Sequence, residues 1–506
     1  MLAKITSGAI VGLDSIPVTV EVDIASQGLP SFTIVGLPDK AIEESKERVR
    51  AALKNAGADF PARRITVNLA PADLPKEGPA YDLPIAIGIL VASGQLDASF
   101  NGSVFYGELS LDGSLRHTAG VLPNAIMASK EKGKSLFIPS VNAREASIVE
   151  NLKVYPVEKI TDLFQHMAGL KSINQYKKAK IKLDSALEYE HDMKDIKGQE
   201  SAKRALEIAA AGGHNVLLKG PPGAGKTLLA RALPSILPNL TWEESLEVTK
   251  IYSVLGYLNN DEAVINTRPF RSPHHSASSI GLIGGGTRPK PGEISLAHRG
   301  ALFLDEFAEF PRSVLEALRQ PLEDGVVTVS RASGTLTFPA KFMLIAAANP
   351  CPCGFLGDTS KECVCTPGQV SRYEKKLSGP ILDRIDLHVF CPSLHSDKLT
   401  AVSEGESSSL IRERVQKARK IQTDRFKKEK IASNGEMSVR QIKQYCSLGT
   451  ESLDLLKAAI SQMKLSARGY HRIIKVARTI ADLEGSNDIK SNHIAEAIQY
   501  RVSEEN

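Results

Sequence analysis

The chain has 506 residues, 42% of them apolar and 24% charged, with a formal net charge of +5. This composition is that of an ordinary soluble globular protein of roughly three domains. It excludes a global polycation, so any anionic partner must be bound by local basic patches.

Long apolar runs are absent from the sequence. Residues 1–24 hold no run of signal-peptide length, and the longest apolar stretch, residues 83–92, is far shorter than the ~20 residues that a membrane helix requires. We therefore expect a cytoplasmic protein that makes no membrane contact. Thiols stay reduced in that compartment, which disfavours disulfides.

Changes in pattern along the chain predict an α/β protein of three domains. Residues 1–168 alternate short β-like runs with helical stretches, and the polar, charged residues 169–194 are typical of a linker. Within residues 195–395, apolar strands alternate with helices, which indicates a parallel α/β sheet. Residues 396–506 hold amphipathic helices and predict an all-α lid.

A phosphate-binding loop follows the first strand of the central block. Residues 220–227 read GPPGAGKT, come directly after an apolar strand and open a helix. Backbone N–H groups at such a helix start bind phosphates, the lysine reaches the β- and γ-phosphates, and the threonine hydroxyl binds Mg²⁺. We expect ATP and Mg²⁺ as cofactors. The predicted nucleotide-binding residues are Gly220, Pro221, Pro222, Gly223, Ala224, Gly225, Lys226 and Thr227.

Two further strands end in polar side chains. The run ALFLDE, residues 301–306, delivers Asp305 and Glu306 to the carboxyl end of a strand, where ligands bind in such sheets. Asp305 fits the Mg²⁺ shell, and Glu306 fits the base that polarises water. An acidic pair after an apolar run usually marks a strand that meets solvent, but its place downstream of the P-loop favours function. Asn349 ends the next apolar run and is expected beside Glu306, orienting the attacking water.

Two arginines complete the predicted catalytic set. Arg384, in DRID, is either an arginine finger for the γ-phosphate of a neighbouring subunit or an ordinary surface salt bridge. Arg468, in SARGYHR, opens a helix of the α-helical block, from which a lid would press it onto the nucleotide.

The order of these motifs resembles that of AAA+ ATPases. Longer stretches, among them FRSPHHSAS, PGEISLAHRGALFLDEF and AANPCPCGF, resemble the magnesium-chelatase-like ComM (YifB) group over essentially the whole chain. The resemblance implies the following site residues: Lys226 and Thr227 in Walker A, Asp305 and Glu306 in Walker B, Asn349 as sensor 1, Arg384 as finger and Arg468 as sensor 2, with Ile196 among the nucleotide-binding residues.

The same resemblance implies a function and partners. ComM-like proteins are ATP-driven hexameric rings and bacterial DNA helicases. They promote branch migration when single strands are integrated during natural transformation. The expected partners are therefore single-stranded and branched DNA, further copies of the chain, and recombination proteins.

The N-terminal block resembles the proteolytic-domain fold of Lon. In KEGPAYDL, Ala80 stands where Lon-like proteases have their nucleophilic serine, and residues 113–120 lack the lysine expected as its partner base. Without a hydroxyl and a base there is no activated nucleophile. The block is therefore predicted to be an inactive scaffold.

Two segments of the ATPase block are candidates for DNA contact. Residues 281–292 form a Gly/Pro-rich loop with Arg288 and Lys290, and residues 324–338 read as a hairpin with Arg331 near its tip. A solvated surface hairpin is the alternative. The basic stretch 412–430 is more typical of a solvated face than of a DNA contact. His274 and His275 are candidates for a metal site or a subunit contact, but no cysteine or carboxylate spacing supports a metal there, so a structural role is expected.

Four of the six cysteines are clustered between residues 351 and 365. Cys351, Cys353, Cys363 and Cys365 form a C-x-C-x₉-C-x-C pattern. Four reduced thiols at this spacing predict one tetrahedral, structural Zn²⁺, with metal-free structural thiols as the alternative.

Three function classes fit these motifs to different degrees. The leading hypothesis is an ATPase that drives DNA branch migration or unwinding. The alternative is the motor subunit of a magnesium chelatase, acting on a protein partner. The Lon-like block and the cysteine cluster argue against the chelatase, and Ala80 weakens a third class, an ATP-dependent protease.

Overall fold

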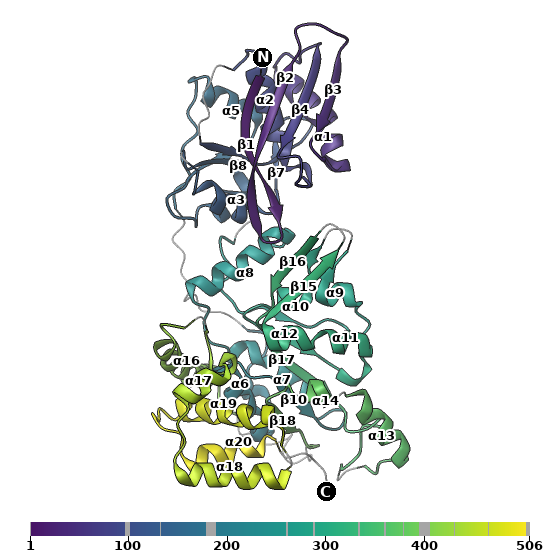
Figure 1. Cartoon of the computed structure of the whole chain (residues 1–506), viewed down its shortest axis with the longest axis vertical. Helices are drawn as coiled ribbons and strands as arrows, with labels where there is room; N and C mark the ends of the chain where they lie inside the picture. Colours follow the sequence, from purple (N-terminus) through teal and green to yellow (C-terminus); the bar gives the residue numbers. More distant parts are fainter. Residues whose placement is uncertain are drawn as a thin grey trace. The chain divides into compact units, whose positions relative to one another are not determined.

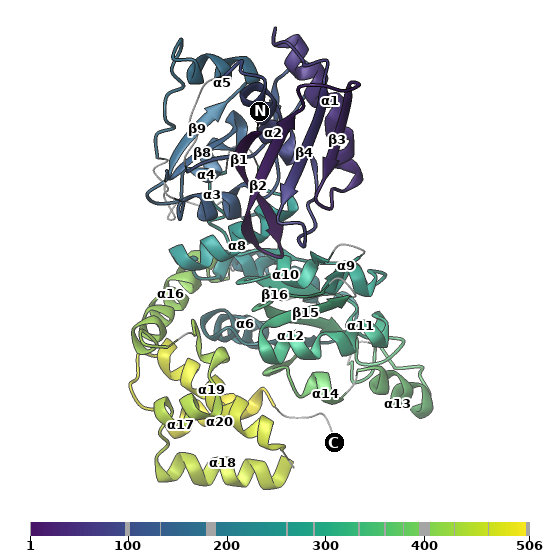
Figure 2. The same cartoon turned by 45° about the horizontal axis from the view of Figure 1, so that its top comes forward.

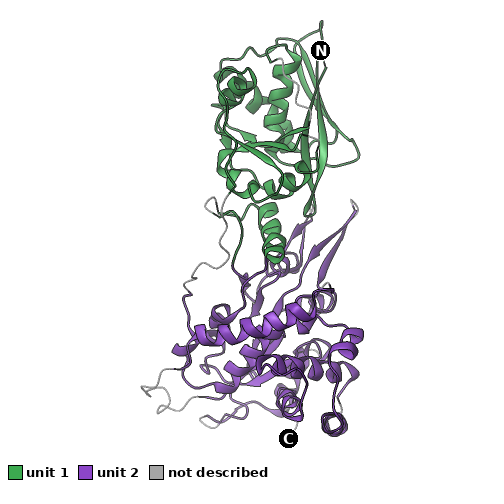
Figure 3. Cartoon of the chain, turned by 90° about the vertical axis from the view of Figure 1, so that its left-hand side faces the viewer, with its two compact units in different colours: residues 1–182, 242–266 green, residues 183–241, 267–506 purple. Residues whose placement is uncertain are grey.

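The computed structural model divides the chain into two compact units (Figure 3). Unit 1 holds residues 1–182 and 242–266, and unit 2 holds residues 183–241 and 267–506. The structure describes residues 2–96, 102–131, 133–178, 189–259, 262–286, 289–331, 334–358, 361–377, 379–393, 405–429, 431–463 and 465–501. Within these ranges no helix is both long enough and apolar enough to span a membrane.

Unit 1 is built on a seven-stranded sheet in the order β3-β4-β2-β1-β5-β8-β9 (Figure 1). Its strands are β1 (Leu2–Val11), β2 (Asp14–Ile24), β3 (Ser31–Val35), β4 (Arg64–Ala70), β5 (Ser103–Phe105), β8 (Ser135–Pro139) and β9 (Lys153–Val157). β1 and β2 pair as a long antiparallel hairpin, and β4 pairs antiparallel with β2. The outer strands pair in parallel, as expected where helices connect them.

The helices of unit 1 differ in how much of their surface is apolar. α2 (Asp82–Ala92) is apolar on almost every side and packs against β1 and β2. α1 (Lys40–Asn55) is amphipathic. Its N-cap is Asp39, whose carboxylate accepts a hydrogen bond from the Ile42 N–H at 2.9 Å. The remaining elements are η1 (Pro79–Tyr81), β6 (Glu108–Leu109), β7 (Leu115–Arg116), α3 (Val121–Ala128), η2 (Ser140–Asn142), α4 (Ala143–Ala146) and α5 (Ile160–Met167).

Ala80, where a Lon-like nucleophile would stand, is buried in η1. Its carbonyl accepts a hydrogen bond from the Gly107 N–H at 2.9 Å. A buried methyl group offers no nucleophile at this position.

Residues 242–266, which the sequence pattern groups with the ATPase block, pack with unit 1. α8 (Trp242–Leu255) contacts α3, and Trp242 and Leu246 lie against the apolar cluster that contains Leu122. The end of α8 is held by polar contacts too, because the Gly120 N–H donates to the Ser253 carbonyl at 2.8 Å. The segment joins unit 1 because this is where its apolar side chains are covered, a contact between distant residues that local periodicity does not reveal.

Unit 2 contains a five-stranded sheet in the order β11-β14-β17-β10-β18, and every neighbouring pair is parallel. Its strands are β10 (Val216–Lys219), β11 (Phe270–Arg271), β14 (Ala301–Leu304), β17 (Met343–Ala348) and β18 (Leu387–Phe390). β14 and β17 are buried at every position, which matches their continuous apolar runs. The predicted parallel α/β sheet is confirmed.

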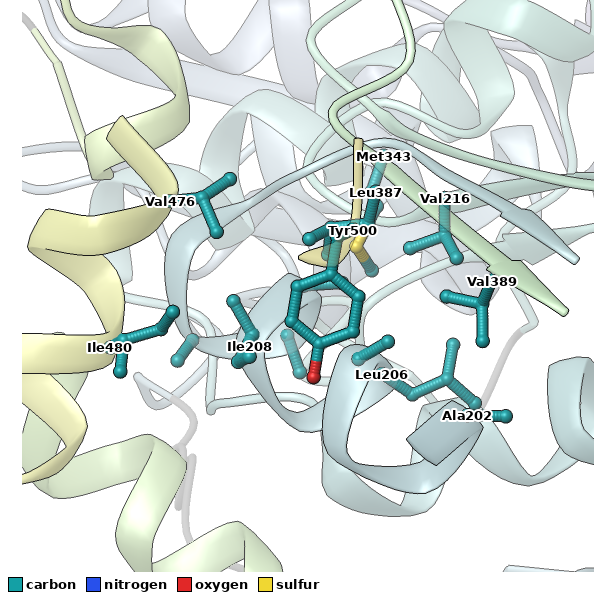
Figure 4. Packing of buried hydrophobic residues seen from close by; sticks show 14 of the residues in the cluster. Ala202, Leu206, Ile208, Val216, Met343, Leu387, Val389, Val476, Ile480 and Tyr500 are labelled. Carbon is teal, nitrogen blue, oxygen red and sulfur yellow. The ribbon is translucent and has the colours of Figure 1, made fainter. Parts of the chain in front are cut away.

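The C-terminal helices share one hydrophobic core with this sheet. Figure 4 shows side chains of the strands and of α6 (Glu200–Gly212) beside Val476 and Ile480 of α19 (Ala467–Leu483), in one cluster. Each fully buried aliphatic side chain of this kind contributes about 1.5–3 kcal/mol. The predicted C-terminal helical region is confirmed. Its helices, grouped together in Figures 1 and 2, are α16 (Ser408–Arg425), α17 (Val439–Tyr445), α18 (Thr450–Met463), α19 and α20 (Ser491–Gln499).

The hairpin predicted for residues 324–338 is present. β15 (Val326–Arg331) and β16 (Gly334–Pro339) pair antiparallel from Val326↔Pro339 to Arg331↔Gly334. The side chain of Arg331 and the whole of Arg288 lie outside the described residues, whereas Lys290 is exposed at the start of β13 (Lys290–Pro291).

Short elements make up the rest of unit 2. They are η3 (Met193–Asp195), α7 (Lys226–Ala232), η4 (Leu233–Ile236), α9 (Ser279–Ile283), β12 (Gly284–Gly285), α10 (Glu293–Leu296), η5 (Phe307–Glu309), α11 (Arg312–Ala317), α12 (Arg319–Asp324), α13 (Pro367–Lys376), α14 (Gly379–Leu382) and η6 (Asn434–Glu436).

Candidate ATPase site

The phosphate loop runs from the end of β10 to the start of α7. Gly223 and Gly225 have φ values of +78° and +84°, in the left-handed region that favours glycine. Gly220 is needed for a different reason, since a Cβ atom there would lie 2.1 Å from the Cys391 carbonyl oxygen at the end of β18. The glycines therefore let the loop turn tightly and lie close against the sheet.

Lys226 is buried beneath this loop. Its Nζ donates to the carbonyls of Gly220 and Pro221 at 2.7 and 2.8 Å and to Asn349 Oδ1 at 3.1 Å. Burial lowers the pKa of the ammonium group. These three acceptors are neutral, and an anionic phosphate oxygen is the stronger partner for a buried cation.

Candidate ligands for Mg²⁺ meet at the carboxyl end of β14. Thr227 Oγ1 donates to Asp305 Oδ2 at 2.9 Å, and the other oxygen of Asp305 accepts from the Glu306 N–H at 2.9 Å. A hydroxyl and a carboxylate are the oxygen ligands that Mg²⁺ takes alongside nucleotide phosphates. The two residues predicted for the metal thus lie together in the structure.

Glu306 is paired with a residue for which the sequence favoured a structural role. Its Oε2 lies 3.2 Å from Nδ1 of His275, and Glu306 itself has a φ of +50°. His275 follows β11, the parallel neighbour of β14, so both residues leave the sheet at the same edge. That shared edge is the signal in the sequence that would have placed His275 in the site.

Asn349 lies directly after β17, between the P-loop strand and the Asp-Glu strand. Its side chain was expected beside Glu306, but the hydrogen bond described for that side chain joins it to Lys226. Tyr373 of α13 adds a contact to the backbone of Asn349, and burial raises the pKa of this tyrosine to about 12. Asn349 is therefore fixed from both the P-loop and α13.

Arg384 and Arg468 come together at a place that the sequence did not indicate. Arg384 is 8% exposed, pairs with the Glu323 carboxylate and donates to the Pro380 carbonyl at 2.7 Å. Arg468 lies 3.5 Å from the other oxygen of Glu323. Across the described residues, neither arginine has a hydrogen bond to Thr227, Asp305 or Asn349.

A buried ion pair links the loop of Arg384 to the helix of Arg468. Asp386 pairs with Arg472 of α19 and accepts the Asn215 N–H at 3.0 Å. Burial raises the pKa of Asp386, but Arg472 and His214 more than offset it, so the net pKa lies well below the usual range. The carboxylate is therefore charged at neutral pH, and the pair ties the two arginine-bearing segments together.

We expect Arg472→Ala to destabilise unit 2 by about 3–5 kcal/mol, because it leaves Asp386 charged and buried without its partner. Chemical denaturation measures this loss, with Lys457→Ala as the control, since Lys457 and Asp454 form an exposed pair worth about 0–1 kcal/mol. The folded-state pKa of Asp386 is depressed, so its contribution is present at neutral pH and lost as the pH falls through that pKa. Equal stability of both variants would contradict this assignment.

Two residues that precede α6 concern the nucleotide site: Ile196, from the sequence-based prediction, and Gln199. Ile196, predicted to bind nucleotide, is 4% exposed and belongs to the hydrophobic core of unit 2. Gln199, which the sequence did not single out, donates from Nε2 to the Ala224 carbonyl at 3.0 Å and to the Pro392 carbonyl at 2.8 Å. Gln199 thus fastens the phosphate loop to the segment that follows β18.

The clustered cysteines form a compact group of four sulfur atoms, all within 4.8 Å of one another. Cys351 Sγ lies 3.4 Å from Cys353 Sγ and 3.6 Å from Cys363 Sγ, and the Cys353 N–H donates to Cys365 Sγ at 3.4 Å. Zinc–sulfur bonds of about 2.3 Å in a tetrahedron place sulfur atoms roughly 3.8 Å apart, so this spacing fits one zinc ion. All six cysteines of the chain are free thiols.

The cysteine loop contacts the phosphate loop directly. Gly354, with a φ of +87°, lies against Pro222, because a Cβ atom on this glycine would come within 2.5 Å of the proline ring. The same Cβ would lie 3.8 Å from the side chain of Asn349. Any group that holds the cysteines together therefore also braces one wall of the nucleotide site.

The parallel sheet, the phosphate loop and the acidic strand end define unit 2 as an ATPase of the AAA+ class. Three family models match the chain: "Subunit ChlI of Mg-chelatase" over residues 20–142, "Magnesium chelatase, subunit ChlI" over 192–399, and "Magnesium chelatase, subunit ChlI C-terminal" over 405–501.

Relatives that match the full length of the chain identify its family within the AAA+ class. The Competence protein ComM of Haemophilus influenzae is 47% identical, over 99% of this chain and 97% of its own length. The Uncharacterized protein YifB of Escherichia coli is 43% identical over the same shares. The Magnesium-chelatase 38 kDa subunit of Rhodobacter capsulatus is 29% identical, over 31% of this chain and 49% of its own length. The chain belongs to the ComM/YifB family of magnesium-chelatase-like AAA+ proteins.

Proposed function

We propose that this protein is an ATP-dependent, hexameric DNA motor. It drives branch migration or unwinding during homologous recombination, and its task is the integration of single-stranded DNA in natural transformation. The relationship to a protein named Competence protein ComM supports this choice of process. ATP and Mg²⁺ are the cofactors for which the P-loop, Thr227 and Asp305 are suited.

The observation that carries the proposal is the separation of the two groups of catalytic candidates. At the P-loop, hydrogen bonds join Lys226 to Asn349 and Thr227 to Asp305. Arg384 and Arg468 meet instead at Glu323. An arginine that stabilises the γ-phosphate in the transition state is supplied either within the chain or by another protein. We assign Arg384 to the nucleotide of a neighbouring copy, as the sequence suggested. We assign Arg468 to the same nucleotide because it meets Arg384 at Glu323, although the sequence placed it on a lid over the nucleotide. A ring would then complete each site.

DNA contact is proposed for two hairpins of unit 2. The β15–β16 hairpin follows α12 directly, and the β12–β13 hairpin presents the exposed Lys290. Lysine and arginine side chains on such hairpins bind the phosphate backbone without reading sequence. Arg288 and Arg331 are assigned to the same role from the sequence alone.

The test is ATP turnover and strand displacement by the purified protein with a three-strand or four-way DNA junction. We expect DNA to stimulate turnover and strands to be displaced, and Lys226→Ala to abolish both, since it removes the buried cation of the P-loop. Turnover that is indifferent to DNA, with no displacement above the Lys226→Ala level, would overturn the DNA motor. It would favour the alternative, a magnesium-chelatase-type motor acting on a protein partner, which the family-model descriptions support.

We also propose that Cys351, Cys353, Cys363 and Cys365 hold one structural Zn²⁺. Four thiolates leave no open coordination position, so the ion closes the loop and does not act on substrate. Elemental analysis of protein purified without chelator is expected to give about one zinc per chain. A Cys351→Ser/Cys363→Ser variant should lose it, whereas Cys446→Ser, a buried cysteine outside the cluster, should keep it. Native protein without zinc would contradict this assignment.

A further inference from the structure

We infer that Glu323 is a positioning residue that couples the β15–β16 hairpin to Arg384 and Arg468. This inference rests on the proposed motor function. It explains how DNA bound at the hairpin would change ATP hydrolysis at the nucleotide site of a neighbouring copy. Three observations support it: the sharing of one carboxylate by two arginines, the place of Glu323 in the chain, and the link between the two arginine-bearing segments.

Each oxygen of the Glu323 carboxylate serves one arginine. Oε2 pairs with Arg384 and Oε1 lies 3.5 Å from Arg468. The Arg384 side chain is only 10% exposed, and its Nε is buried without a hydrogen-bond partner among the described residues. An arginine in this position has to leave the carboxylate before it can bind a phosphate in another chain, because its charge is already compensated.

Glu323 lies at the base of the hairpin. It is in the last turn of α12, whose C-cap is Gly325, and β15 begins at Val326. The two strands are closed at this point by the Ala340 N–H, which donates to the Gly325 carbonyl at 2.8 Å. A Cβ atom on Gly325 would lie 2.8 Å from the Lys341 side chain, so the base is closely packed. We therefore expect a displacement of the hairpin to move Glu323 as well.

The two arginines respond as one unit because their segments are joined. The buried Asp386–Arg472 pair connects the loop of Arg384 to α19, four residues along that helix from Arg468. Arg472 also contributes to lowering the pKa of Glu323, after the larger effects of Arg384 and Arg468. Glu323 thus connects the base of the hairpin to Arg384 and Arg468. A hairpin displaced by DNA would weaken or strengthen the ion pairs of Glu323 with both arginines.

The test compares Glu323→Gln with Asp324→Asn, a neighbouring exposed carboxylate outside the arginine cluster. ATP turnover is measured for each protein with and without a branched DNA junction. For Glu323→Gln we expect turnover without DNA to rise severalfold, because the arginines are released, and the ratio of turnover with DNA to turnover without it to fall to about 1. Asp324→Asn should keep the native rates and ratio, and Glu323→Asp, which keeps the charge, should restore part of the ratio.

Other outcomes separate this inference from its alternatives. A parallel fall of both rates in Glu323→Gln, with the native ratio retained, would show that the carboxylate only stabilises the fold and would overturn the inference. Native rates and ratio in that variant would overturn it as well. A native protein that DNA does not stimulate would instead overturn the proposed motor function, and the coupling with it. Circular dichroism and binding of a non-hydrolysable ATP analogue establish that each variant is folded.

Discussion

Replacing Arg384 with alanine is expected to lower ATP turnover by about 10³–10⁵-fold while nucleotide binding persists. The reason is that Arg384 is proposed to act on the nucleotide of a neighbouring copy, whereas the P-loop that is expected to hold the nucleotide of its own chain is unchanged. Steady-state turnover and equilibrium binding of a fluorescent ATP analogue measure the two effects. Arg312→Ala is the matched control, because the side chain of that arginine is 81% exposed and its ion pair with Glu316 is long, at 3.9 Å.

A mixing experiment sharpens this prediction. If Arg384 acts on the nucleotide of a neighbour, a mixture of Arg384→Ala and Lys226→Ala chains contains junctions with an intact P-loop on one side and an intact arginine on the other. Such a mixture should regain measurable turnover although each variant alone is inactive. A mixture that stays as inactive as its components would argue against an arginine shared between chains, and so would full turnover in Arg384→Ala by itself.

Replacing Glu306 with glutamine is expected to lower the rate of hydrolysis by about 10²–10⁴-fold, the usual contribution of a general base. The amide keeps the size of the side chain and its place next to His275, but it cannot accept a proton from the attacking water. ATP should still bind, because Lys226, Thr227 and Asp305 are unchanged, so this variant should accumulate in the ATP-bound state.

Single-turnover measurements separate this chemical defect from a binding defect. Glu309→Gln is the control, since Glu309 lies three residues further on and forms a half-exposed pair with Lys376 at 3.3 Å. If Glu306→Gln hydrolyses ATP at the native rate, the base is another group. If both variants lose ATP binding, the acidic segment has a structural role.

Much of the fold could be predicted from local sequence, for a physical reason. A parallel strand covered on both faces must be apolar throughout, so the runs before Gly220, Asp305 and Asn349 were recognisable as buried strands. Their carboxyl ends share one edge of a sheet, which placed the P-loop and the acidic residues near one another. The hairpin of residues 324–338 was recognisable from its alternation.

Contacts between distant residues were not predictable in the same way. Glu323 meets Arg468 across 145 positions, and Gln199 reaches Pro392 across 193. No periodicity encodes such a pairing, because the partners are brought together only by packing. The same holds for Asn349, whose strand end was recognised but whose hydrogen bond to Lys226 was not. The local sequence pattern thus identified candidate catalytic and binding residues, whereas only the tertiary structure shows which of them are in contact.

The packing of α8 determines whether the two units can be separated by a single cut in the chain. The segment 242–266 leaves unit 2 shortly after the P-loop helix and returns just before β11, yet its apolar side chains are covered by unit 1. A chain that began at residue 195 would retain this segment and expose Trp242 and Leu246 to water. A single cut in the linker therefore cannot separate the two units without exposing apolar side chains. Substitutions in α8 are also constrained by residues far from it in the sequence, such as Leu122.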